Sequence, residues 1–205
     1  MTTGLTVEPL GPANVEALVA LFDASGCACY CRYFHFGGTK NEWLDRLAHR
    51  PEEGAAELRA SVGPTLGDHA PLGAGGLVAW GAESDGSRPE VVGWTKVVPL
   101  AAVPKLRAQG AYRSLDLGDE TSTLVVGCLL VHPAHRASGV TRALVAEAKR
   151  LAATSSATRL LGLPRRSALR LYDEEAFAGP ERVYVDLGFR LLHDSPAYPV
   201  YGVDF

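Results

Sequence analysis

The chain has 205 residues, of which 47% are hydrophobic and 21% are charged, and 20 Lys and Arg against 23 Asp and Glu give a formal net charge of −3. This balance argues against non-specific binding to nucleic acid, and the apolar content argues against wholesale disorder. The longest mostly apolar stretch, 124–131, is far shorter than the roughly 20 residues that cross a bilayer, so no membrane association is expected.

The first half of the chain predicts helices followed by a strand pair. Apolar residues fall on one face of a helix over 14–25: Val15, Leu18, Val19 and Phe22. A second helix is expected after Asn41, with Trp43, Leu44 and Leu47 at helical spacing, and Pro51 favours the start of a third that runs to Val62. A Gly- and Pro-rich loop over 63–76 follows. Two apolar stretches, 77–82 and 91–98, flank a polar turn over 83–90 and predict a β-hairpin.

The second half alternates strands and helices. Residues 101–109 predict a short or irregular helix, and the β-branched and leucine-rich stretch 121–132 predicts a buried central strand. A helix over 139–153 follows at once, with Val140, Leu144, Ala148 and Leu151 on one face. The remaining expected elements are a strand over 158–163, a helix over 181–187, and strands over 189–193 and 198–203. This order predicts an α/β fold, a mixed sheet covered by helices, in one domain spanning 1–205.

The junction between the central strand and the next helix carries the clearest chemical signal. Backbone N–H groups at a helix start lack intrahelical partners and lie at the positive end of the helix dipole, so the junction suits a phosphate or pyrophosphate. Gly139 permits close approach of a ligand, and Arg136 adds positive charge just before it. The alternative is a purely structural strand-to-helix loop.

These residues resemble the GCN5-related N-acetyltransferase (GNAT) superfamily. Its acyl-CoA loop reads Arg/Gln-x-x-Gly-x-Gly/Ala after a strand that ends in Val-x-Pro, and Val131, Pro133, Arg136 and Gly139 match. Thr141 departs from the pattern because it is β-branched where the family has Gly or Ala. The resemblance implies a mostly antiparallel central sheet flanked by helices, with a V-shaped opening for acyl-CoA. It further implies a bulge in the central strand near Leu130 and Val131 that offers N–H groups to the cofactor, and a pyrophosphate held by Arg136, Ala137, Ser138, Gly139, Val140 and Thr141.

A second match lies near the C-terminus. The segment 184–189, Tyr-Val-Asp-Leu-Gly-Phe, is similar to the family's late Tyr-x-x-x-Gly-Phe segment. The resemblance implies that Tyr184 protonates the departing CoA thiolate. Without the loop, the same tyrosine would be interpreted as a core aromatic on a short helix.

The cysteines suggest a narrower resemblance and a rival interpretation. The segment 26–33, Gly-Cys-Ala-Cys-Tyr-Cys-Arg-Tyr, resembles that of an uncharacterised bacterial GNAT-like group with an early Gly-Cys-Trp-Cys sequence. Zinc ligation by Cys27, Cys29, Cys31 and His35 is the rival, but Cys-x-Cys-x-Cys is tighter than the usual spacing of zinc ligands. Buried reduced thiols or the wall of an acceptor site are favoured, and no metal is expected.

The sequence therefore predicts a cytoplasmic acyl-CoA-dependent N-acyltransferase that transfers an acyl group, in the first instance acetyl, to an amine of a small molecule or peptide. A non-catalytic acyl-CoA-binding or regulatory module with the same fold is the alternative. The base is not identified by any motif, and Glu42 and Glu120 are candidates. Acetyl-CoA or another acyl-CoA is the expected co-substrate, no nucleic acid or membrane partner is expected, and a homodimer is left open.

Overall fold

The structure, a computed structural model, describes residues 4–63, 72–81, 89–169, 171–172 and 175–205. Most of the loop predicted over 63–76 and of the turn predicted over 83–90 lies outside these residues. Among the described residues no helix is long and apolar enough to cross a membrane.

Seven described strands form one sheet in the order β1-β2-β3-β4-β5-β7-β6. The strands are β1 (Thr6–Pro9), β2 (Gly76–Trp80), β3 (Val91–Pro99), β4 (Thr123–Val131), β5 (Arg159–Gly162), β6 (Arg190–His193) and β7 (Val200–Asp204). The pair β4 and β5 is parallel, and the other neighbours are antiparallel. The predicted mixed α/β fold with a mostly antiparallel sheet is confirmed.

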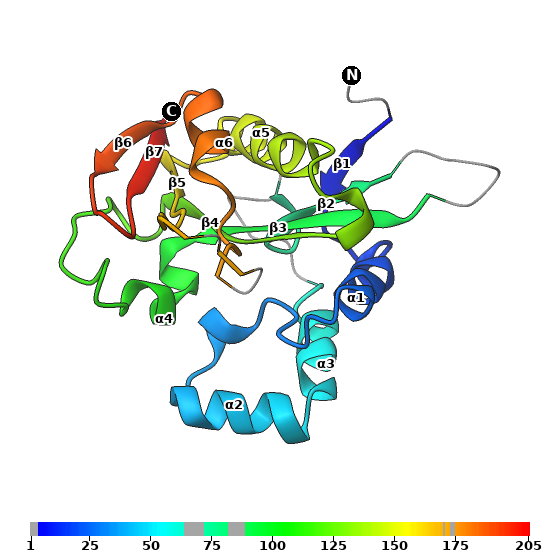
Figure 1. The fold of residues 1–205 in the computed structure, drawn as a ribbon. Helices are drawn as coiled ribbons and strands as arrows, with labels where there is room; N and C mark the ends of the chain where they lie inside the picture. The colour runs from blue at the N-terminus through cyan, green and yellow to red at the C-terminus, as the bar shows by residue number, and fades with distance from the viewer. Residues whose placement is uncertain (1–3, 64–71, 82–88, 170, 173–174) are drawn as a thin grey trace.

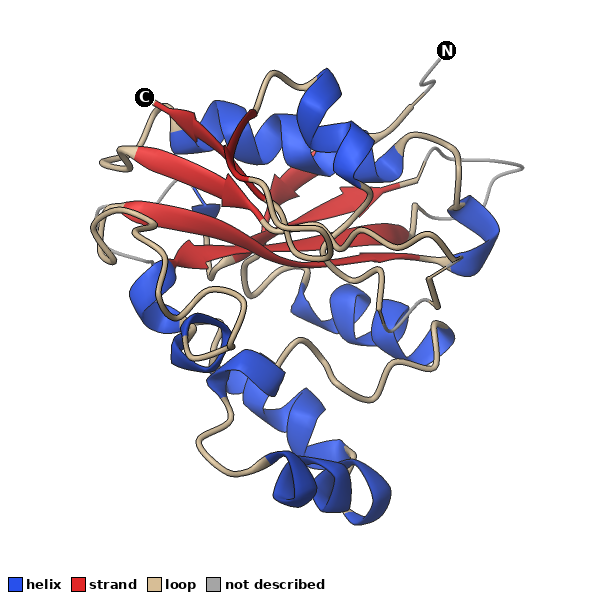
Figure 2. Ribbon diagram, turned by 60° about the vertical axis from the view of Figure 1, so that its left-hand side comes forward, coloured by secondary structure: helices blue, strands red, loops and turns tan. Residues whose placement is uncertain are grey.

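Helices cover both faces of this sheet (Figures 1 and 2). On one face lie α5 (Val140–Ala152) and α6 (Glu181–Asp186), and on the other lie α1 (Val15–Ala24) and α3 (Glu52–Ala60). Helix α2 (Lys40–His49) is on this second side as well, but farther from the sheet. The short α4 (Pro104–Arg107) and three 3-10 turns, η1 (Tyr33–His35), η3 (Leu100–Ala102) and η4 (Pro133–His135), connect the larger elements. Strands covered on both faces are buried along their length, so every position of β3 and β4 is buried or half-buried, Thr95 and Lys96 of β3 included, and neither strand alternates.

Two local features differ from the sequence expectations. β1 is not predicted, because it is only four residues long, ends in Pro9 and lies half-buried at the edge of the sheet, where the pattern of a strand is weakest. In α2 the side chains that become buried are Trp43 and Arg46, while Leu44 is 52% exposed. The helix itself begins after Thr39, whose side chain forms a capping box with Glu42.

Helix α5 packs on the sheet as its periodicity predicts. Val140, Leu144, Ala148 and Leu151 are all buried on one face, together with Val145 and Ala152. The helix follows β4 directly through η4 and a loop. Its first turn therefore lies beside the end of the central strand.

The sheet opens between β4 and β5, and this opening positions the candidate site. Pairing of the two strands stops at Val126 and Gly162, so β4 continues to Val131 without β5 alongside it. The bulge in β4 is at Gly127, because Lys96 pairs with Cys128 and Val97 with Val126. The expectation of a bulge near Leu130 and Val131 was wrong, because the bulge lies earlier in the strand. The extra residue is Gly127, the only glycine of β4.

Candidate active site

A cavity of about 400 Å³ lies where β4 ends and α5 begins. It is lined by Leu129, Leu130, Val131, His135, Arg136, Ala137, Gly139, Val140, Thr141, Arg142, Ala176, Gly179, Pro180 and Val183. Seven of the eight residues predicted to hold a cofactor are therefore brought together here. The eighth, Ser138, does not line the cavity; its hydroxyl instead donates to the His135 carbonyl, 2.5 Å away, and closes the loop on itself.

The loop before α5 has the backbone of an anion-binding turn. Ala137 and Gly139 have φ values of 59° and 89°, and Gly139 is the N-cap of α5. No side chain caps this helix, and no acidic residue occupies its first turn. The first N–H groups of a 13-residue helix therefore remain for a ligand, at the positive end of the helix dipole.

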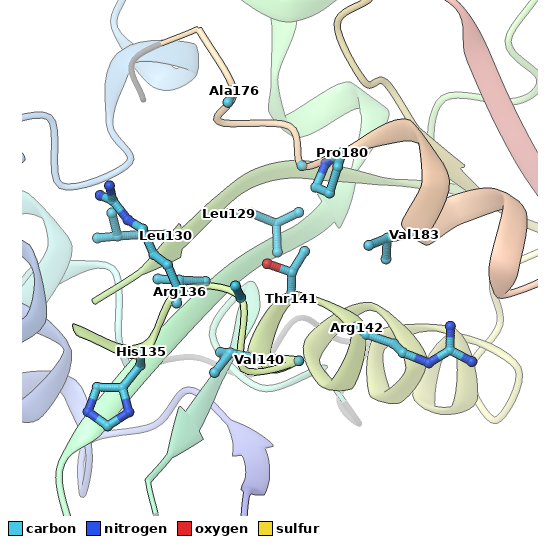
Figure 3. Close-up of a pocket in the computed structure, with 14 residues that line it drawn as sticks. Leu129, Leu130, His135, Arg136, Val140, Thr141, Arg142, Ala176, Pro180 and Val183 are labelled. Carbon is cyan, nitrogen blue, oxygen red and sulfur yellow. The ribbon is translucent and has the colours of Figure 1, made fainter. Parts of the chain in front are cut away.

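Two arginines flank the cavity (Figure 3). Arg136 precedes the loop, and Arg142 belongs to the first turn of α5, where its Nη1 lies 3.7 Å from Asp186 Oδ2. Figure 3 shows the two side chains directed to opposite sides of the opening, with Thr141 between them. Positive charge and free helix N–H groups together favour an anion with several phosphate oxygens.

The free edge of β4 beyond the bulge is partly covered by residues 175–180, which we call the dividing segment. Leu129 N–H donates to the Phe177 carbonyl oxygen, 2.6 Å away. Ala176, Gly179 and Pro180 of this segment line the first cavity, whereas Glu175, Phe177 and Ala178 line a second one. The dividing segment thus separates two cavities that both reach β4.

Tyr184 lies beneath the dividing segment and does not line the first cavity. It is fully buried, and its hydroxyl donates to the Ala178 carbonyl oxygen, 2.6 Å away. Its ring fits against Gly162, where an added Cβ would lie 2.2 Å from a ring carbon. Burial raises the pKa of the Tyr184 hydroxyl above its ordinary value, so the group keeps its proton at neutral pH.

The second cavity, of about 380 Å³, lies on the other side of the dividing segment. Its lining is Tyr33, Leu106, Gln109, Tyr112, Val126, Gly127, Leu163, Arg165, Glu175, Phe177, Ala178 and Tyr198. It touches β4 at the Gly127 bulge, two residues before Leu129. Sequence reasoning missed this cavity because its residues come from distant stretches; Tyr33 belongs to the segment 26–33 quoted for its resemblance, but the resemblance assigned it no role.

The two candidate bases lie outside both cavities. Glu42 accepts hydrogen bonds from the Thr39 backbone and hydroxyl at the start of α2. Glu120 lies 3.3 Å from Arg107 Nε in a surface ion pair. Each carboxylate thus has a structural partner.

The cysteine segment packs into the core of the α1 face. Cys31 is buried, Cys27 and Cys29 are half-buried, and Cys31 shares a hydrophobic cluster with Cys128 of β4. His35 Nε2 lies 2.8 Å from Lys96 Nζ, and burial together with this charge lowers the pKa of His35 to about 3. Within the part of the chain that the structure describes, no three His, Cys, Asp or Glu side chains converge to hold a metal ion.

Comparison with known proteins identifies the family of the chain. The sequence model of the acetyltransferase (GNAT) family matches residues 42–177, more than half of the chain. This range includes β4, the loop 136–141 and the first residues of the dividing segment. No curated protein matches the chain.

Solved structures share the fold at low sequence identity. The chain is similar to PaiA N-acetyltransferase from Thermoplasma acidophilum in complex with coenzyme A, with 11% identity, 99% of this chain and 100% of that chain covered, and a TM-score of 0.50. YncA from Salmonella typhimurium with its cofactor acetyl-CoA is 15% identical, with 98% and 94% covered and a TM-score of 0.52. The GNAT domain of PAT from S. lividans is 16% identical, with 97% and 89% covered and a TM-score of 0.54.

Proposed function

The chain belongs to the GNAT acetyltransferase family, and we propose that it is an acyl-CoA-dependent N-acyltransferase that transfers an acyl group, in the first instance acetyl, to an amine of a small molecule or peptide. The observation that carries this proposal is the first cavity, which joins the free edge of β4 to the uncapped start of α5. Two of the structures with the same fold were solved with coenzyme A or acetyl-CoA. A protein that shared only the fold would not need a cavity at this place.

The residues present fit the phosphate end of acyl-CoA. The loop turns at Ala137 and Gly139 without bulky side chains, and the N–H groups that begin α5 have no side-chain cap. Arg136 and Arg142 lie on either side of the cavity and would neutralise pyrophosphate oxygens. Thr141 narrows the opening relative to Gly or Ala but brings a hydroxyl to the same wall, which can donate to a phosphate.

Backbone and side-chain groups of β4 would bind and orient the acyl donor. Bound acyl-CoA would supply an acyl group activated as a thioester. Leu129 N–H lies on the free edge of β4 and would donate to this donor once the Phe177 carbonyl moves away. Leu130 and Val131 follow Leu129 in β4 and line the cavity, and they would hold the part of acyl-CoA that links the phosphates to the thioester.

Tyr184 would act as the acid for the leaving sulfur. Its raised pKa keeps the proton on the oxygen, and the dividing segment above it lies between the two cavities. The Ala178 carbonyl takes the tyrosine's hydrogen bond in the structure, so the hydroxyl must exchange this partner for the sulfur during turnover. The movement that frees Leu129 would also free Tyr184, because both are held by adjacent carbonyls of one segment.

One contact favours a second candidate function. The hydrogen bond from Leu129 to Phe177 occupies the edge of β4 that a bound donor would use. If the dividing segment stays in place when the phosphates bind, the chain is a non-catalytic acyl-CoA-binding module. Binding and turnover therefore need separate measurements.

Calorimetry with acetyl-CoA tests the site assignment. Reversing the charge in Arg136→Glu should raise the Kd about tenfold to a hundredfold, since charged hydrogen bonds contribute about 1.5–3 kcal/mol. The matched control is Arg150→Glu, which also reverses a charge on α5 but lies in its last turn, where Arg150 pairs with Glu147. Equal affinities in all three proteins, or no binding to any of them, would exclude this cavity as the acyl-CoA site.

A further inference from the structure

We propose that the second cavity binds the acceptor and selects an amine that carries a carboxylate beside an apolar or aromatic body, as an α-amino acid does. This inference rests on the proposed acyl transfer and gives it a substrate class. It is based on the position of the cavity, its size, one ion pair and its aromatic walls.

The position suits an acceptor because the cavity adjoins the expected end of the acyl donor. It reaches the Gly127 bulge and Val126 on β4, and it shares the dividing segment with the first cavity. Phe177 and Ala178 line it, and the Phe177 carbonyl oxygen accepts from Leu129 N–H on the β4 edge. A donor threaded from the first cavity along this edge would therefore present its acyl carbon to the second.

The size favours a small acceptor. Ligand pockets commonly measure about 300–1,000 Å³, and this cavity, at about 380 Å³, is at the lower end of that range. A single amino acid or a peptide end fits such a volume. A folded protein surface could place only one side chain or terminus in it.

The charged groups of the cavity form one neutral pair. Arg165 Nη1 and Glu175 Oε1 are 2.6 Å apart, and the two side chains are 35% and 34% exposed, so a ligand can reach both. A ligand with a carboxylate and an ammonium group can bind both partners, and no charge is then left uncompensated. A simple cationic amine would pair with Glu175 but oppose Arg165, and a simple acid would do the reverse.

Aromatic rings supply the rest of the wall. Tyr112 and Tyr198 meet edge to face with ring centroids 6.3 Å apart, and Arg165 lies 5.8 Å above the Tyr198 ring. Tyr33 and Phe177 complete this lining. Burial, with a smaller effect of Tyr198, raises the pKa of Tyr112 to about 12, so this wall stays uncharged. Flat apolar walls beside a charged pair match an amino acid with an aromatic or large aliphatic side chain.

The transfer itself balances with this acceptor. The amine nitrogen forms a bond to the acyl carbon while the bond from that carbon to sulfur breaks. The sulfur gains one proton, and the ammonium nitrogen loses two in becoming an amide, so one proton is released to solvent. Nothing beyond acyl-CoA and the amino acid is consumed.

Calorimetry with three related probes tests the selection. L-Phenylalanine carries both charged groups, phenethylamine lacks the carboxylate, and 3-phenylpropionate lacks the amine. The wild-type protein should bind phenylalanine more tightly than either of the others. In Arg165→Gln the Kd for phenylalanine should rise about tenfold or more, as expected for a lost charged hydrogen bond, while phenethylamine should bind more tightly because Glu175 is no longer paired.

Glu175→Gln should give the opposite change and favour 3-phenylpropionate. This reversal distinguishes recognition from misfolding, which would weaken all probes alike. The control Arg150→Gln breaks an ion pair of the same 2.6 Å length on the outer face of α5 and should change none of the three affinities. Melting temperatures of all variants are measured to detect misfolding. Arg165→Lys is included as a variant that conserves the charge.

The outcomes separate this inference from the proposed function. If acetyl-CoA binds but phenylalanine binds no better than phenethylamine, or if Arg165→Gln weakens both probes equally, the acceptor assignment is wrong and the acyl-CoA site stands. If acetyl-CoA does not bind, the proposed function fails first, whatever the second cavity holds.

Discussion

At the scale of single residues, Tyr184 lines neither cavity but contacts the backbone that separates them. Its hydroxyl is held by Ala178, which lines the second cavity, and an added Cβ at Gly179, which lines the first, would lie 3.8 Å from the same oxygen. The sequence motif predicts the role but not the covering segment, because residues 175–180 form a loop whose position depends on its contacts with β4 and Tyr184.

Tyr184→Phe separates the two roles of this side chain. The ring stays packed against Gly162 and Phe189, and only the hydroxyl is lost. If the hydroxyl is the acid for the leaving sulfur, kcat should fall about a hundredfold to ten-thousandfold while KM and Tm change little. An unchanged kcat would remove Tyr184 from the mechanism, and a fall in Tm with proportionate loss of activity would mark it as a packing residue.

His35 should make the stability of the fold depend on pH. Burial and the nearby Lys96 lower its pKa to about 3, so the folded protein keeps His35 neutral where the unfolded chain takes up a proton. Unfolding is then favoured as the pH falls from about 6.5 towards 3, and the contribution of neutral His35 is fully present above that range. Denaturant melts at pH 7 and pH 5 should show a smaller loss of stability for His35→Gln than for the wild type. An equal loss in both proteins would show that His35 does not cause it.

At the scale of elements, the accuracy of sequence reasoning follows the strength of local patterns. The periodicity of α5 and the apolar run of β4 specify both elements, because each is covered along its length by the core. The loop 136–141 is local as well, so most of its residues could be named in advance. β1 has too few residues to show a pattern, and the bulge depends on how β4 pairs with β3, which only the fold decides.

The dividing segment is the element whose geometry matters most for the proposed function. Gly179 has a φ of 78°, and an added Cβ would lie 2.6 Å from Leu129 Cδ1. Gly179→Ala should therefore distort the wall of the first cavity and, if acyl-CoA binds there as proposed, raise the Kd for acetyl-CoA severalfold. Gly110→Ala is the matched control, because an added Cβ there meets nothing within 4 Å and no unusual φ is required. Equal affinities for both variants would mean that the wall does not touch the ligand.

At the scale of the whole molecule, the fold brings together residues that no local pattern connects. The second cavity combines η1, the stretch around α4, the β4 bulge and the loops that carry Arg165, Glu175 and Tyr198. No local pattern marks the residues that these segments contribute, so sequence reasoning could not assign them to an acceptor site. The family, and the loop proposed to hold acyl-CoA, can be inferred from a short motif, whereas the proposed acceptor site depends on long-range packing.

The most direct test of the central claim is the formation of an acylated amine. The wild-type protein, incubated with acetyl-CoA and L-phenylalanine together with a panel of other amino acids and simple amines, should release free CoA thiol and give N-acetylated product by mass spectrometry. Tyr184→Phe should give much less. If acetyl-CoA binds the wild-type protein and no amine in the panel is acetylated above the level of the protein-free control, the chain is a binding module and not a transferase.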